Sequence, residues 1–137
     1  MLLDTRASAN IIQLDIQKKL GLLIRESKTR IKPLSGPASQ VHGICKNVNT
    51  GIGHIRNVTD FHIMDNTNIP LVFGQPYIRR SRMTFEYPEE GMDAGAQLAI
   101  FTEAATGRRG RILVTYSSSA FEDENEENIA LSNEGDF

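Results

Sequence analysis

The nine residues LLDTRASAN, at positions 2–10, carry an acidic side chain from an apolar run into a turn of small polar residues. Two leucines precede Asp4, and the residues that follow it are of the kinds that form tight turns. An acid at the end of an apolar strand usually costs stability, because a charged group loses hydration when it is buried. Asp4 is therefore a candidate catalytic carboxylate. Arg6 is an unexpected neighbour, because a small residue would be expected there.

The composition fits one globular domain followed by an acidic tail. Of the 137 residues 39% are hydrophobic, and 11 Gly and 5 Pro make the chain rich in turns. Seven acids and no base lie between Glu122 and Phe137, which leaves 15 bases and 10 acids in the rest. We predict a folded domain over residues 1–119 and an acidic, disordered tail over residues 120–137.

Neither a cofactor nor a metal site is indicated. Cys45 is the only cysteine, which excludes an intrachain disulfide, and His42, His54 and His62 lack the spacing of a zinc site. No apolar run approaches the roughly 20 residues of a membrane-spanning helix, and no basic and apolar leader is present. We expect an intracellular, cytoplasmic protein that does not bind a membrane.

Short apolar runs between turn residues predict mainly β structure. A short helix is expected over Gln13–Leu20, with Gly21 as its C-terminal stop. The expected strands are Met1–Asp4, Asn10–Ile12, Gln40–Val48, Ile55–Met64, Leu71–Phe73, Met83–Tyr87, Gln97–Phe101 and Arg111–Tyr116. The third and fourth of these form a hairpin around a turn at residues 50–53, and the last two form another over a loop at residues 106–110.

The order of these segments resembles that of the retropepsin-like aspartic proteases. The matching segments are LLDT (2–5), Ala7-Ser8, Asn10-Ile11-Ile12, the helix that ends in Leu20-Gly21-Leu22, a glycine-containing loop, and IPLVFGQPYI (69–78). Within that family the chain looks most like the protease region of long-terminal-repeat retrotransposon polyproteins of the gypsy-like class. The resemblance covers residues 1–87, and less securely the hairpin at 97–116. Asp-Thr alone is a weak signal, but its conjunction with an apolar strand that ends in glycine about 70 residues later is more specific.

The resemblance implies an all-β fold, namely a closed barrel with one short helix, and aspartic endopeptidase activity. In that family two aspartates share one proton around a water molecule. One acts as a base toward the water, and the other protonates the carbonyl oxygen of the peptide bond. This chain supplies one aspartate in the right setting, Asp4, so the resemblance implies a homodimer with one Asp4 from each copy. The substrate would be a polypeptide, cut within a polyprotein.

The resemblance also assigns roles to the residues around Asp4. Thr5 would hydrogen-bond across the dyad, and Arg6 and Ala7 would continue the active-site loop. A flap that folds over the substrate would contain Ser35, Gly36 and Pro37. The strand behind the active-site loop would comprise Leu71, Val72, Phe73 and Gly74. Glycine is needed at the end of that strand, because a side chain would collide with the loop.

Arg6 departs from the family pattern, in which the third residue of the motif is glycine and its N–H faces the carboxylates. Arginine keeps the N–H but adds a side chain and a permanent cation beside the dyad. Two such cations would favour ionisation of both carboxylates and so remove the shared proton. An alternative reading is therefore a catalytically inactive retropepsin-like module that binds peptides or dimerises.

A third reading leaves the resemblance aside. The clusters Arg79-Arg80-Ser81-Arg82 and Arg108-Arg109-Gly110-Arg111 are basic, as in a small β-rich nucleic-acid-binding domain. Aromatic residues are sparse around both clusters, so solvated loop charge is the favoured explanation. Nucleic acid is therefore not the expected partner.

Overall fold

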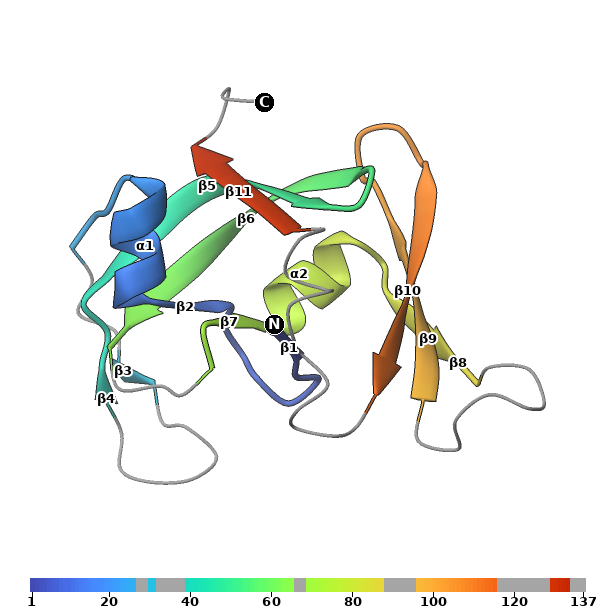
Figure 1. Cartoon of the computed structure of the whole chain (residues 1–137), viewed down its shortest axis with the longest axis horizontal. Helices are drawn as coiled ribbons and strands as arrows, with labels where there is room; N and C mark the ends of the chain where they lie inside the picture. Colours follow the sequence, from blue (N-terminus) through green and yellow to red (C-terminus); the bar gives the residue numbers. More distant parts are fainter. Residues whose placement is uncertain (27–29, 32–38, 66–68, 88–95, 116–128, 134–137) are drawn as a thin grey trace.

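The computed structural model describes residues 1–26, 30–31, 39–65, 69–87, 96–115 and 129–133, and its largest element is a six-stranded mixed sheet (Figure 1). In spatial order the strands are β1 (Leu2–Leu3), β7 (Leu71–Phe73), β2 (Ile11–Gln13), β6 (Ile55–Met64), β5 (Gly43–Ile52) and β11 (Ile129–Asn133). A second sheet has the order β10 (Arg109–Thr115), β9 (Ala96–Thr102) and β8 (Thr84–Glu86). The short strands β3 (Arg30–Ile31) and β4 (Ser39–Gln40) pair with each other.

The pairing around β7 fixes the position of the loop that contains Asp4. Strand β1 runs parallel to β7, with Leu3 opposite Phe73, whereas β2 runs antiparallel to the other side of β7. Strand β2 is also parallel to β6. Because β7 lies between β1 and β2, which are consecutive in the sequence, residues 4–10 must pass over the end of β7 to join them.

The expected all-β closed barrel is wrong. The described strands form an open mixed sheet with two parallel pairs and a separate three-stranded antiparallel sheet, so the fold is mixed α/β. A barrel would require the two outer strands of the sheet to pair. Here β1 and β11 are the outer strands, and no pairing between them is present among the described residues.

The expectation of a single helix is also wrong, because the described residues form two. Helix α1 spans Leu14–Leu20 and ends at Gly21, whose φ of 66° is left-handed, as the sequence predicts. Helix α2 spans Gln75–Arg80 and was not expected. Its one local signal is Pro76 in the first turn, a position that proline favours because it needs no N–H partner there.

Both expected hairpins are present, with shifted turns. Strands β5 and β6 pair as far as Ile52 and Ile55, so the turn is Gly53-His54, and residues 50–52 belong to β5. Gly53 has a φ of 59°, which suits a glycine in a two-residue turn. Strands β9 and β10 pair from Thr102 and Arg109 onward, so the loop there begins at residue 103 and ends at residue 108.

The acidic tail was expected to be entirely disordered, and this is wrong for residues 129–133. They form β11, which pairs antiparallel with β5 along the edge of the six-stranded sheet (Figure 1). Residues 120–128 and 134–137 lie outside the described part of the chain.

The centre of the core lies directly beside the loop that contains Asp4. Phe61 on β6 meets Phe73 on β7 edge to face, with ring centroids 5.7 Å apart, and the Phe73 ring lies 4.6 Å from that of Tyr77 on α2. All three side chains are fully buried, and such aromatic pairs add to the stabilisation that comes from burial. Strand β7 is therefore a rigid support for whatever rests on it.

Candidate active site

Asp4 lies at the end of β1 and is held there by its own backbone. Its N–H donates to the carbonyl oxygen of Phe73 at 2.9 Å, which extends the β1–β7 ladder by one residue. Its carbonyl oxygen accepts from the N–H of Ala7 at 3.2 Å, which closes a four-residue turn. The Asp4 side chain is half-buried. The predicted catalytic carboxylate is thus at the rim of a tight turn and accessible to solvent.

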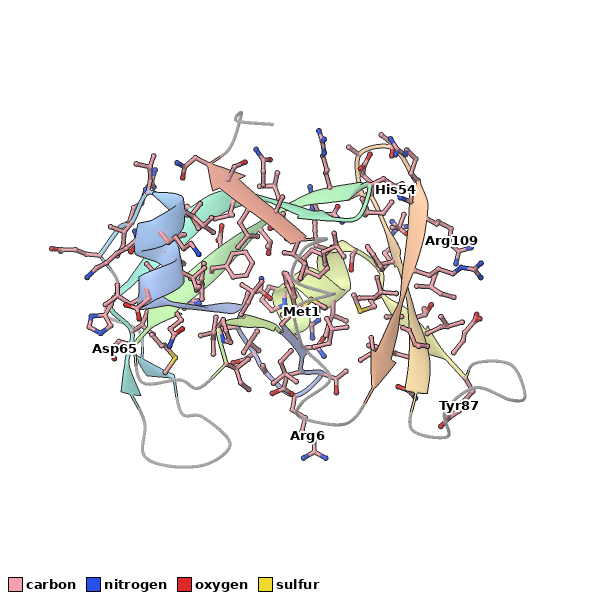
Figure 2. The ribbon with its side chains drawn as sticks, viewed as in Figure 1. Met1, Arg6, His54, Asp65, Tyr87 and Arg109 are labelled. Atoms are coloured by element: carbon pink, nitrogen blue, oxygen red, sulfur yellow. The ribbon has the colours of Figure 1, made fainter. Side chains whose placement is uncertain are left out.

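The N–H of Arg6 faces the Asp4 carboxylate, as the family pattern implies for the third residue of the motif. It donates to Oδ1 of Asp4 at 2.9 Å. The only non-glycine residues with positive φ in the described ranges are Asn47 and Arg82, so Arg6 needs no glycine conformation. Its side chain is exposed and extends outward from the turn (Figure 2). The arginine is therefore accommodated without backbone strain.

Gly74 is required for close packing, as predicted. A Cβ atom at this position would overlap the carbonyl oxygen of Ala9 and lie 2.7 Å from that of Ala7. The φ of Gly74 is −103°, so its role is to leave space and not to adopt a left-handed conformation. The expected strand Leu71–Phe73 is present as β7, and its three residues are all buried.

Asn10 joins this strand to the loop, and sequence reasoning missed its role. Its side chain is fully buried, and Oδ1 accepts the N–H of Gly74 at 2.8 Å. Its Nδ2 donates to Oγ1 of Thr59 at 2.9 Å and to the carbonyl oxygen of Asp60 at 3.0 Å. A buried amide with all these partners fixes the end of the loop against both β7 and β6. The only sequence signal was an asparagine directly before an apolar strand.

Gln75 holds the other part of the loop and was also missed. Its backbone N–H donates to the carbonyl oxygen of Ala7 at 2.8 Å, and its Nε2 donates to the carbonyl oxygen of Thr5 at 2.6 Å. The Thr5 side chain is exposed, so its predicted contact across a dimer axis stays a prediction. Gly74 and Gln75 together connect the loop to β7 and to the start of α2.

The predicted flap residues lie outside the described part of the chain. They are Ser35, Gly36 and Pro37. The segments on either side are described, and Ile31 of β3 pairs with Ser39 of β4 in an antiparallel arrangement. Ile31 and Ser39 therefore lie opposite each other on paired strands.

Other titratable groups near the core are suited to structural roles. Cys45 is fully buried, and burial raises the pKa of its thiol to about 11, so it stays protonated at neutral pH and is a poor nucleophile. Burial also lowers the pKa of His62, against the opposing effect of Asp60. In the described ranges there is no group of three or more His, Cys, Asp or Glu side chains that could hold a metal ion.

Two further surface features lie away from Asp4. A largely apolar cavity of about 430 Å³ lies between α1, β7 and β11, and its wall includes Met1, Leu20 and Leu131, but no residue of the 4–10 loop. The two basic clusters are on neighbouring segments, because Thr102, the partner of Arg109, donates its N–H to the carbonyl oxygen of Ser81. All six arginines of these clusters are exposed, which fits solvated charge.

Neither described helix has the length and apolar character that crossing a bilayer requires. Comparison of the sequence with models of known protein families gives no match, and comparison with curated proteins gives no significant match.

Proposed function

We propose that this protein is a retropepsin-like aspartic endopeptidase that hydrolyses peptide bonds of a polyprotein as a homodimer. The observation that supports this most is the way the Asp4 loop is braced. An acid sits at the end of a short strand, its Oδ1 accepts a backbone N–H two residues on, and the loop crosses a glycine that has no room for a side chain. This amount of rigid support under an accessible carboxylate suits a group that must be held in position for chemistry.

The proposed mechanism uses one Asp4 from each of two copies. The two carboxylates bind a water molecule and share one proton, because two negative charges a few ångströms apart resist ionising together. The unprotonated carboxylate removes a proton from the water as it attacks the peptide carbonyl carbon, and the protonated one donates to the carbonyl oxygen. The tetrahedral diol then collapses: its C–N bond breaks, the departing nitrogen receives the proton that was taken from the water, and one hydroxyl proton returns to the other carboxylate. The Arg6 N–H on Oδ1 keeps each carboxylate from rotating during these transfers.

The position of Asp4 in the sheet supports a dimeric site. β1 is an outer strand of the six-stranded sheet, and Asp4 follows it directly. A second copy related by a two-fold axis could therefore approach the loop without displacing another described strand of this sheet. The site needs that copy, because the braced loop contains one acid.

A second candidate function, an inactive peptide-binding or dimerisation module, is favoured by one observation. Arg6 stands where the family pattern has glycine, and its exposed side chain adds a permanent cation to the turn that carries Asp4. If both Asp4 side chains remain ionised, the proton donor for the carbonyl oxygen is missing.

A cleavage assay separates the two functions. The purified chain is incubated at acidic pH with a proteome-derived peptide library, and cleavage is followed by mass spectrometry. We expect cleavage that pepstatin inhibits and that Asp4→Asn abolishes. Asp15→Asn is the matched control, because Asp15 is an exposed acid on α1, outside the loop. Absence of cleavage by the wild type and by Arg6→Gly would contradict the protease proposal and favour the inactive module.

A further inference from the structure

The backbone contacts of Arg6 restrict where its side chain can lie. Its N–H is bound to Oδ1 of Asp4, and the turn around it is closed by the hydrogen bond from Ala7 to Asp4. The Arg6 side chain therefore leaves the backbone at a fixed point, on the same turn that carries the Asp4 carboxylate. Figure 2 shows it extending away from the body of the molecule, and the residue is exposed.

The Arg6 guanidinium is available to a ligand. Ion pairs seen among the described residues include those of His42 with Asp65 and of Lys46 with Asp60, and neither of these two involves Arg6. The residues that follow it in the loop, Ala7 and Ser8, carry no charge. An arginine whose guanidinium has no partner among the described residues offers its planar set of donors to a carboxylate.

We propose that Arg6 is a specificity residue that selects substrates with an aspartate or glutamate next to the cleaved bond. This inference rests on the proposed endopeptidase function. A peptide that crosses the Asp4 pair advances about 3.3–3.6 Å per residue, so the side chains on either side of the cleaved bond pass within reach of a long side chain on the same turn. In a symmetric dimer each side of the bond meets one guanidinium.

Charge chemistry gives the direction and size of the effect. A carboxylate on the substrate pairs with the guanidinium, a neutral amide of the same shape pairs more weakly, and a lysine is repelled. One charge-assisted hydrogen bond corresponds to a discrimination of about tenfold or more. The preference should weaken as salt is raised, because Arg6 is exposed and its field is screened.

The test measures a ratio, so that a general loss of activity does not imitate the result. The library assay first identifies a cleaved sequence, and three peptides are then made that differ only in having Glu, Gln or Lys beside the cleaved bond. For the wild type we expect kcat/KM for the Glu peptide to exceed that for the Gln peptide about tenfold, with the Lys peptide lowest. For Arg6→Gln, which keeps the N–H and much of the side-chain length, the Glu to Gln ratio should fall toward one. Arg6→Lys should retain part of the preference.

Each other outcome identifies which idea has failed. A wild-type ratio near one, or the same ratio in Arg6→Gln, overturns the specificity role but leaves the protease proposal intact. Cleavage by Arg6→Gly but not by the wild type does the same, and shows Arg6 to be inhibitory. No cleavage by the wild type or by Arg6→Gly overturns the proposed function, and the inference fails with it.

Discussion

The backbone N–H of Gly74 donates to the buried Oδ1 of Asn10 at 2.8 Å, which links the end of β7 to the residue that leads into β2. The same glycine leaves room for the carbonyl oxygens of Ala7 and Ala9. Gly74 therefore acts in two ways: its N–H binds the end of the loop, and its lack of a side chain lets the loop pack closely against it. The shape of the Asp4 turn depends on contacts with Gly74, which lies 64 residues beyond Asn10 in the chain.

Replacement of Gly74 by alanine should destabilise the fold and distort the Asp4 loop. The added methyl group would overlap the Ala9 carbonyl oxygen, which is backbone and cannot rotate away. We expect a loss of about 2–3 kcal/mol in the free energy of unfolding, measured by urea denaturation. Ser8→Ala, an exposed change in the same loop, should have little effect. Equal stability of Gly74→Ala and wild type would contradict the crowded geometry.

Replacement of Asn10 by alanine should cost about 2–4 kcal/mol of stability, because it leaves several buried polar groups without partners. These are the Gly74 N–H, the Thr59 hydroxyl and the Asp60 carbonyl oxygen. Asn49→Ala is the control, since Asn49 is half-buried and its side chain donates to the carbonyl oxygen of Asn133 at the sheet edge. We expect a much smaller change in the urea midpoint for the control. Similar losses for the two variants would show that Asn10 has no special role.

The contact between the β5–β6 hairpin and the β9–β10 hairpin should weaken in acid. It depends on the Glu103 carboxylate, which accepts the N–H of Arg56. Hydrogen bonds from the Thr106 hydroxyl, at 2.7 Å, and from the Arg56 N–H, at 2.8 Å, lower the pKa of Glu103 from its ordinary value. A carboxylate whose pKa is lower in the folded state adds stability above its unfolded pKa. That stability is lost as pH falls through the folded pKa.

We therefore expect the difference in Tm between wild type and Glu103→Gln to be largest near neutral pH. It should shrink as the pH falls from about 5 toward 3, because the wild-type carboxyl then becomes protonated too. Thermal denaturation of both proteins over this range measures the effect. Parallel curves for the two proteins would contradict it.

Cys45 should be unreactive in the native protein. Burial raises the pKa of its thiol to about 11, so the reactive thiolate is scarce at neutral pH. The side chain is also fully buried, so a reagent cannot reach it. Reaction with a thiol reagent at pH 8 should be very slow without denaturant and rapid in concentrated urea. Fast labelling of the folded protein would show that β5 opens readily at this position.

The elements that could be predicted are those whose determinants lie within their own residues or directly beside them. Helix α1 was predicted from its spacing and from Gly21, which stops it by a left-handed turn. Strand β7 was predicted from an unbroken apolar run, and the steric role of Gly74 came with the resemblance. The contact between the Asp4 carboxylate and the Arg6 N–H also came with the resemblance, which implies that the N–H of the third motif residue faces the carboxylate.

The remaining features depend on partners far away in the sequence. Whether β1 and β11 close a barrel depends on which strand edges pair. The residues of a single strand do not reveal its partner, so the parallel pairings of β1 with β7 and of β2 with β6 could not be predicted. Strand β11 lies within an acidic stretch whose composition predicts disorder. It forms by pairing with the edge of β5. Helix α2 is too short for its period to be recognised.

The site shows the same division. Asn10 and Gln75 act through amide groups that bind the backbone at Gly74 and Thr5, respectively. A polar side chain has no pattern that reveals such a distant acceptor or donor, so neither residue could be assigned from the sequence.

Because β11 belongs to the sheet, residues 116–128 connect two strands of the fold and are not a free C-terminal tail. They leave from β10 and return at β11, so both ends of this acidic stretch are anchored to described strands. A cut within it would divide the polypeptide but leave the smaller piece paired to β5 through five residue positions. An affinity tag spliced into this stretch would likewise be fixed at both ends, on a segment separate in sequence from the Asp4 turn.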